Sequence, residues 1–465
     1  MDILISIFNV FIDIFQIPAI ILGLVAMVGL LVQRKNFSAV VTGTIKTILG
    51  LLILAGGIGI LVGALIPFGI MFEYAFNLTG IVPFCEAMVG GIIATVPNVA
   101  IATSLIMGFG FIGNIILARV SPFKYIFLTG HMIWIMAASL AWAFHDLGFS
   151  LAMNVLFGTI IQSMLMVVLP AIAQPIMRKL TGGDKIAYAH LSTLGVCVSG
   201  VVGGKLGNKE HNAEDMKVPK GLDFFRDVAA SVSLVMFIIY LIVAFASGPR
   251  FISENLSGGQ NFLIFTFIQA FTFAAGVLIL LQGVRMFLGE IIPAFRGVAI
   301  KLIPGSVPAL DCPVTFQYGP TSLIIGMVFA FIGSMFGLGF AIVFGLVVPL
   351  PTIIGCFFTG GTSAIFGNAL GGRRGACIAG FIYGLVLTIP VALFYPLFYN
   401  YGVVGLGVAS IDAVTTLSLI WLSSVVHPIV GPMILTGIAA LAFIAVSVKV
   451  AKKQKTLGAT VQADE

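Results

Sequence analysis

The chain is a succession of long apolar segments, from residue 17 to residue 450, separated by short basic loops. Hydrophobic residues make up 60% of it, charged residues only 9%, and the mean hydropathy is +1.17. A soluble core could not bury that much apolar surface, so the surrounding solvent must be lipid. The runs are continuously apolar, which excludes a transmembrane β-barrel because barrel strands alternate apolar and polar residues. The sequence therefore predicts an all-α polytopic membrane protein.

The positions of the basic residues predict the topology. A spanning helix needs roughly 20 apolar residues, and the apolar runs allow about eleven spans, the last at residues 419–448. Cytoplasmic loops carry the excess of Lys and Arg. Arg34 and Lys35 follow the first span, and Lys449, Lys452 and Lys453 follow the last. We therefore expect a multi-pass membrane protein, with its N-terminus outside and its C-terminus in the cytoplasm.

We expect residues 1–465 to form one integral membrane domain. Some of its segments do not resemble plain spans. Residues 205–227 are rich in both charge signs and predict a cytoplasmic loop. Residues 284–304 mix four charges with Phe, Leu and Ile, which favours an amphipathic interfacial helix. Residues 68–95 are interrupted by Gly and Pro, and residues 186–204 are too short to cross and return as two spans. The second of these segments predicts a re-entrant hairpin.

A faint internal repeat appears at an offset of 230 residues, since Thr129-Gly130 is matched by Thr359-Gly360. In the expected topology the two spans run in opposite directions. Inverted repeats with broken helices are typical of alternating-access transporters that bind substrate near the membrane midplane. A chance match of two residues is the alternative.

Four polar side chains stand out because polar groups inside a membrane are costly and usually functional. Glu86 follows a Pro-Phe-Cys turn, His131 begins an apolar span, His190 lies in a Gly-rich stretch, and Asp311 lies between two prolines. Imidazoles and carboxylates together can bind a ligand with many hydroxyl groups. The alternatives are structural: an interfacial carboxylate, a helix-end histidine, a polar loop and a loop-end cap.

Other functional classes leave no signal in the chain. The net charge of +6 comes from basic residues at segment ends, so nucleic acid is not an expected partner. The five cysteines lie in apolar surroundings without metal-ligand spacing, and no nucleotide-binding loop appears. We expect no cofactor, no metal and no catalysis by this chain alone.

Several motifs in a constant order resemble those of the ascorbate-specific enzyme IIC family, in the ascorbate and galactitol superfamily of the bacterial phosphotransferase system. They lie at residues 43–48, 128–131, 205–210, 214–215, 282–287 and 296–311. The resemblance implies about eleven spans in interleaved scaffold and core domains, with two re-entrant hairpins around the substrate. It also implies a homodimer in the lipid of the bacterial inner membrane, which moves by an elevator mechanism and works with cytoplasmic A and B components.

The resemblance also implies a set of substrate-binding residues. His131, His190 and Asp311 keep the residue types of the family, whereas Glu86, Ile135 and Leu191 replace the aromatic and amide groups expected there. The full set is Cys85, Glu86, His131, Met132, Ile133, Trp134, Ile135, His190, Leu191 and Asp311.

The sequence thus predicts the substrate-translocating subunit of a sugar phosphotransferase system, for L-ascorbate or a related sugar acid or polyol. An ion-coupled secondary transporter of a small polar solute is the alternative, with Glu86 or Asp311 as the proton site. A channel-like or structural membrane protein is the third possibility. Delivery of phosphorylated product that depends on the B component would distinguish the first from the others.

Overall fold

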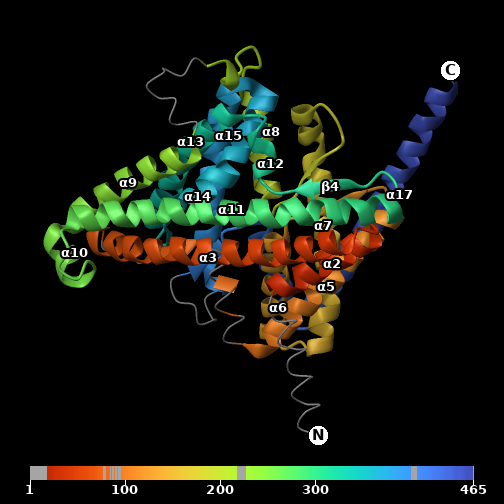
Figure 1. Ribbon diagram of the computed structural model, residues 1–465, viewed down its shortest axis with the longest axis horizontal. Coiled ribbons are helices and arrows are strands. Elements are labelled where there is room, and N and C mark those ends of the chain that lie inside the picture. Colours follow the sequence, from red (N-terminus) through yellow and green to blue (C-terminus); the bar gives the residue numbers. More distant parts are fainter. Residues whose placement is uncertain are drawn as a thin grey trace, which may run out of the picture.

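The computed structural model is helical throughout, with a few very short strands (Figure 1). It describes residues 18–76, 80–83, 85, 88–89, 92, 96–216, 227–398 and 406–463. Five described helices are long and apolar enough to span a membrane, or six if the bent pair α9 and α10 forms one span. They are Pro97–Val120, Leu151–Thr181, Pro320–Val343, Cys356–Leu397 and Val430–Gln454. The predicted multi-pass helical membrane protein is confirmed, while the count of eleven spans stays a prediction.

The first half of the chain alternates helices with strands. Its elements are α2 (Pro18–Val32), α3 (Phe37–Phe76), β1 (Gly80–Pro83), α5 (Pro97–Val120), β2 (Tyr125–Phe127), α6 (Gly130–Asp146), α7 (Leu151–Thr181), β3 (Ala187–Tyr188), α8 (Thr193–Leu206) and the 3-10 turn η1 (Ala213–Asp215).

The second half repeats much of this order. Its elements are α9 (Val228–Ser247), α10 (Pro249–Asn255), α11 (Phe262–Leu302), β4 (Val307–Leu310), α12 (Pro313–Phe316), α13 (Pro320–Val343), β5 (Val348–Pro349), α14 (Ile353–Gly355), the π-helical turn η3 (Cys356–Gly360), α15 (Gly361–Phe398), β6 (Leu406–Gly407), α16 (Ile411–Ser424) and α17 (Val430–Ala463).

Two small parallel sheets join the halves. In one, β1 of the first half lies between β5 and β6 of the second; in the other, β4 of the second half lies between β2 and β3 of the first. In each half the central strand follows a long helix, α3 or α11. The fold therefore contains two interleaved copies of one element order. The Thr-Gly match at an offset of 230 residues does not correspond to this structural repeat, in which β2 and β5 occupy equivalent places. Thr129 lies next to β2, whereas Thr359 lies inside η3, farther from β5.

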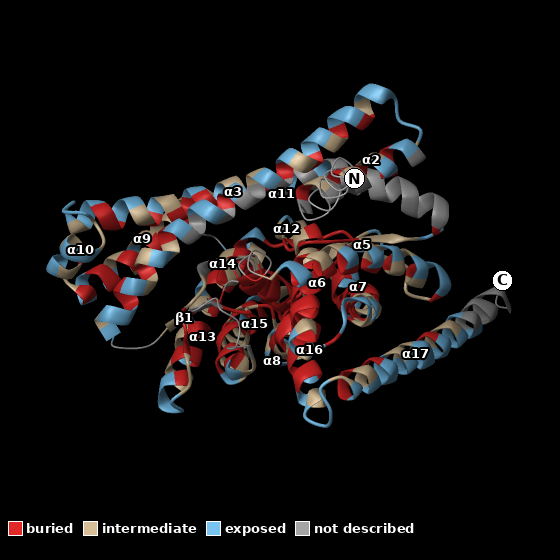
Figure 2. Cartoon of the chain, turned by 90° about the horizontal axis from the view of Figure 1, so that it is seen from below, coloured by how far each residue is buried: buried red, intermediate tan, exposed pale blue. Residues whose placement is uncertain are grey.

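The long helices α3 and α11 lie side by side along one side of the molecule, with α9 and α10 at one end (Figures 1 and 2). The Ser247 hydroxyl donates to Met71 O at 2.8 Å, and the Tyr240 hydroxyl donates to Ala64 O, so α9 is fastened to α3. Helix α2 also packs against α3 and α11, whereas most of the other helices form a bundle beside the arm of α3, α9 and α11. Residues 284–302 continue α11 without a break, so the helix expected at 284–304 is not an element of its own, and its interfacial placement stays a prediction.

The structure interrupts two apolar stretches in the second half of the chain. The span expected at 419–448 is wrong, because a turn at 425–429 separates α16 from α17. Helix α15 is interrupted by non-helical backbone at Gly371 and Gly372. Gly372 has φ +63°, and a Cβ there would lie 2.1 Å from Asn208 O. Only glycine combines this backbone with that contact.

The segment that follows α8 is fastened across the bundle. The Glu214 carboxylate accepts hydrogen bonds from Thr321 N (2.8 Å), Ser322 N (2.9 Å) and the Ser322 hydroxyl (2.6 Å). These amides begin α13, where free N–H groups and the helix dipole favour an anion. Asn212 and Asn368 are also hydrogen-bonded, at 2.7 Å. Of the loop predicted at 205–227, residues 217–226 lie outside the described part.

Replacing Glu214 with alanine should destabilise the protein. The change leaves the first amides of α13 without their cap, which typically costs about 0.5–2 kcal/mol. Thermal unfolding in detergent should show a lower midpoint for Glu214→Ala than for Asp215→Ala, a neighbouring exposed carboxylate. Equal midpoints for the two variants would show that the cap contributes nothing.

Candidate functional site

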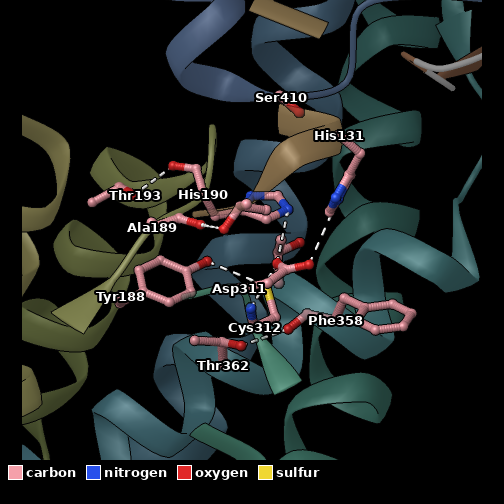
Figure 3. A network of polar contacts seen from close by, with 12 residues as sticks. His131, Tyr188, Ala189, His190, Thr193, Asp311, Cys312, Phe358, Thr362 and Ser410 are labelled. Atoms are coloured by element: carbon pink, nitrogen blue, oxygen red, sulfur yellow. Dashed lines mark hydrogen bonds and ion pairs between the residues drawn. The ribbon is translucent and has the colours of Figure 1, made fainter. Parts of the chain in front are cut away.

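Three polar side chains meet at one edge of the sheet formed by β2, β4 and β3. His131 follows β2 at the start of α6, Asp311 follows β4 directly, and His190 follows β3 (Figure 3). The carboxyl ends of parallel strands lie at the same edge of a sheet, which is where ligands bind in many α/β sheets. Because β4 is the central strand, Asp311 lies between the two histidines. The structure thus brings together three of the side chains singled out from the sequence, His131, His190 and Asp311, while their role as substrate ligands stays a prediction.

The three side chains are close without being hydrogen-bonded to one another. His131 Nε2 lies 3.6 Å from Asp311 Oδ2, and His190 Nε2 lies 3.9 Å from Oδ1. Both distances exceed that of a good N–H···O bond, about 2.7–3.2 Å. The imidazole rings face each other edge-on, with centroids 6.3 Å apart. The cluster is therefore arranged so that a ligand hydroxyl could bind between an imidazole and the carboxylate.

The site is buried and retains unused hydrogen-bonding capacity. Asp311 and His190 are 7% and 6% exposed. Within the described part of the chain, neither His131 Nδ1 nor His190 Nδ1 has a hydrogen-bond partner. A buried polar atom without a partner costs about 1–3 kcal/mol. A ligand that supplied partners for these nitrogens would therefore recover part of that cost.

Hydrogen bonds from threonine hydroxyls to backbone carbonyls fix the two loops that carry the histidines. Thr129 Oγ1 donates to Ala189 O at 2.6 Å, so the loop before His131 is joined to the loop before His190. Thr193 Oγ1 donates to His190 O, also at 2.6 Å. Tyr188 stacks near the His190 ring, with centroids 6.2 Å apart, and its hydroxyl lies 3.3 Å from Cys312 Sγ (Figure 3). The histidines are positioned by neighbours on all three strands.

A buried carboxylate that the sequence reading missed holds the His190 loop from the other side. Asp412, 1% exposed, accepts hydrogen bonds from Thr193 N at 2.8 Å and Leu194 N at 3.0 Å. These amides begin α8, so Asp412 of α16 caps a helix that is distant in sequence. The available signal was an isolated acidic residue within an apolar run.

The sheet formed by β5, β1 and β6 contributes part of the same region. Cys85 follows β1, and its sulfur lies 3.6 Å from Ser410 Oγ and accepts from Ala409 N at 3.0 Å. Ser410, which was not singled out from the sequence, is among the side chains drawn with the cluster in Figure 3. Glu86 lies outside the described residues, so its place in the site stays a prediction.

The remaining predicted residues are mostly apolar lining or core. Trp134 and Ile135 follow His131 by three and four residues, which places both on its side of α6. Ile135 is fully buried and Trp134 is half-buried. Met132 and Ile133 are buried in the apolar core. The Leu191 side chain is also in this core, while its carbonyl accepts from Asp412 N at 2.8 Å. A substrate-binding role for these residues stays a prediction.

The cluster has two chemical capacities. Its carboxylate and imidazoles can together accept and donate hydrogen bonds to several hydroxyl groups. One ligand atom from each of the three residues also lies within 4.8 Å of the others. Two imidazoles and a carboxylate suit a transition-metal ion as well. Its position inside an apolar bundle fits either a transported solute or a bound cation.

Comparison with known proteins identifies the family of this chain. The model of the EIIC-GAT family, described as the sugar-specific permease component of PTS (phosphotransferase) systems, matches residues 13–416. The chain belongs to this family. The predicted resemblance to phosphotransferase permeases is confirmed.

One curated relative has a name that is more specific than that of the family. The chain is 27% identical over 431 residues to a Mycoplasma pneumoniae protein named the ascorbate-specific PTS system EIIC component. The match covers 81% of this permease chain but only 64% of the relative. The chain therefore spans less than two thirds of the relative's length.

Truncation of either histidine should weaken binding of a polyhydroxylated substrate. His131→Ala and His190→Ala should each cost about 1–3 kcal/mol, roughly 5- to 150-fold in affinity. Because both face Asp311, the double variant should lose less than the sum of the two. Calorimetric titration of purified protein with L-ascorbate measures this, with His211→Ala on the exposed loop as the control. Strict additivity, or wild-type affinity in either variant, would separate the histidines from a common ligand.

Proposed function

We propose that this permease is the substrate-translocating subunit of a phosphotransferase system for L-ascorbate or a related sugar acid or polyol. The observation that carries the proposal is the position of Asp311 between His131 and His190. Polar groups at such a place inside a lipid-embedded bundle are expensive and usually serve a transported solute. The name of the Mycoplasma relative supports ascorbate as the first substrate to test.

The chemistry of the cluster favours a small molecule with several hydroxyl groups. The Asp311 carboxylate can accept from two hydroxyls, and the imidazoles can each donate or accept. Ile135 and Leu191 offer no side-chain polar atom, so discrimination depends on the three polar groups. Sites that hydrogen-bond a hydroxyl strongly reject analogues that lack it. We therefore expect deoxy analogues of the substrate to bind poorly.

Phosphate transfer would be supplied by other proteins. Four of the five cysteines are buried and Cys377 is half-buried, so none of them is an exposed phosphate carrier. In the proposed mechanism a cytoplasmic B component presents phosphocysteine to the bound sugar and an A component recharges it. This chain binds and releases the substrate and contributes no catalytic residue.

The docking face for the B component would surround the loop after α8. Lys205, Lys209, Arg373 and Arg374 are exposed there. Arg373 N donates to His211 O at 2.7 Å, which brings the two basic pairs together. An excess of positive charge marks the cytoplasmic face, which supports a cytoplasmic C-terminus and an external N-terminus.

Movement would be of the elevator type in a homodimer. The arm of α3, α9 and α11 is separate from the bundle that carries the site (Figure 2), which fits a scaffold and a moving core. The interleaved repeat supports this interpretation, since repeats of inverted topology underlie alternating access in many transporters.

Uptake into membrane vesicles tests the proposal. Vesicles with this permease, the A and B components and phosphoenolpyruvate should accumulate labelled ascorbate as its phosphate ester. Asp311→Asn should lose binding and uptake, since each lost charge-assisted bond costs about 1.5–3 kcal/mol. Glu254→Gln, on the exposed helix α10, is the matched control. Accumulation of unmodified substrate that needs an ion gradient and no B component would instead establish a secondary transporter.

A further inference from the structure

The last helix, α17, stands away from the bundle (Figure 2). Only 6% of its most apolar stretch is buried against the rest of the chain. Between α17, α7 and α16 lies a groove of about 610 Å³. That volume is within the range of sites that hold small ligands, about 300–1,000 Å³.

The groove accepts hydrocarbon and nothing polar. Its walls are formed by apolar side chains, and only Thr416 and Thr436 among the lining residues carry a side-chain hydroxyl. Both hydroxyls are already used within their own helices, donating to Asp412 O at 2.7 Å and to Pro432 O at 2.8 Å. An occupant must therefore be an apolar chain.

A basic residue follows the groove-lining residues of α17 on the same side of the helix. Val446 and Val450 line the groove, and Lys453 follows them by seven and three residues, which places it on the same side of the helix. Lys452, two residues after Val450, points to another side. Both lysines are exposed.

The end of α7 adds positive charge to the same place. Ile172 lines the groove, and the exposed Lys179 follows it by seven residues on the same face. Phe123 closes this end, with its ring centroid 6.1 Å from that of Phe443 of α17. Lys124 is next to it and donates to Arg119 O at 3.0 Å. Because α7 packs against β2, which begins at Tyr125, Lys124 and the end of α7 belong to the same part of the molecule. Val450 and Ile172 are the last lining residues of α17 and α7, and Lys453 and Lys179 follow them.

We propose that the groove binds an acyl chain of an anionic phospholipid, with the phosphate headgroup held by Lys124, Lys179 and Lys453. Apolar walls that end in a group of cations match such a lipid at both ends. Basic pockets between membrane helices are known to select anionic headgroups. A second copy of this chain fits less well, because an identical α17 would bring its own lysines against this group.

Native mass spectrometry of the full chain tests the headgroup. Phosphatidylglycerol should stay bound under conditions that remove phosphatidylcholine with the same acyl chains. Lys453→Glu should weaken phosphatidylglycerol retention by at least about fivefold, the effect of one lysine near an anionic lipid. Lys452→Glu should leave it unchanged. Equal retention of the two lipids, or equal effects of the two lysine variants, would overturn the proposal.

A second pair of variants tests the hydrocarbon part. Ala442→Phe fills the groove and should remove the bound lipid, whereas Ala445→Phe, at a position that does not line the groove, should retain it. If Ala442→Phe instead turned a dimer into a monomer and left lipid binding intact, the groove would be an interface between two copies and the proposal would be wrong.

Discussion

The structure depends on the cost of placing a carboxylate inside an apolar bundle. Among the described residues no Lys or Arg lies within ion-pair distance of Asp311, whose carboxylate is approached by His131 and His190. Cys312 N also donates to Asp311 Oδ1 at 2.6 Å. In hydrocarbon, irregular backbone is tolerated only where it is enclosed by protein or lines a cavity. The chain meets this condition by pairing β4 with β2 and β3. These strands satisfy their own backbone groups and bring three side chains to one edge.

Two other carboxylates make this arrangement rigid. Asp412 caps α8, directly after the His190 loop, and Glu214 caps α13, which follows the Asp311 turn. Each belongs to a different segment from the helix that it caps, so each joins two parts of the bundle. The free amides at a helix start favour an anion, and no cation is needed. Acidic groups inside the bundle and at its edge therefore serve both the site and its support.

Much of the site could be predicted from the sequence, because an isolated polar residue in an apolar run is a strong local signal. His131, His190 and Asp311 were identified in this way. Asp412 was missed because the last span was placed too late. The boundary between α16 and α17 was missed because Val425 and Val426 keep its turn apolar, although Pro428 marks it. The strands were not predicted, since pairing between β4 and its distant partners leaves no local pattern.

The most direct measurement is a cryo-electron microscopy map of the permease with L-ascorbate in a lipid nanodisc. We predict ligand density at the edge of the β2, β4 and β3 sheet, with ligand oxygens within about 2.6–3.2 Å of the Asp311 carboxylate and both His Nε2 atoms. Density for the ligand elsewhere, with His131, Asp311 and His190 unliganded, would contradict the site on which the proposed function rests.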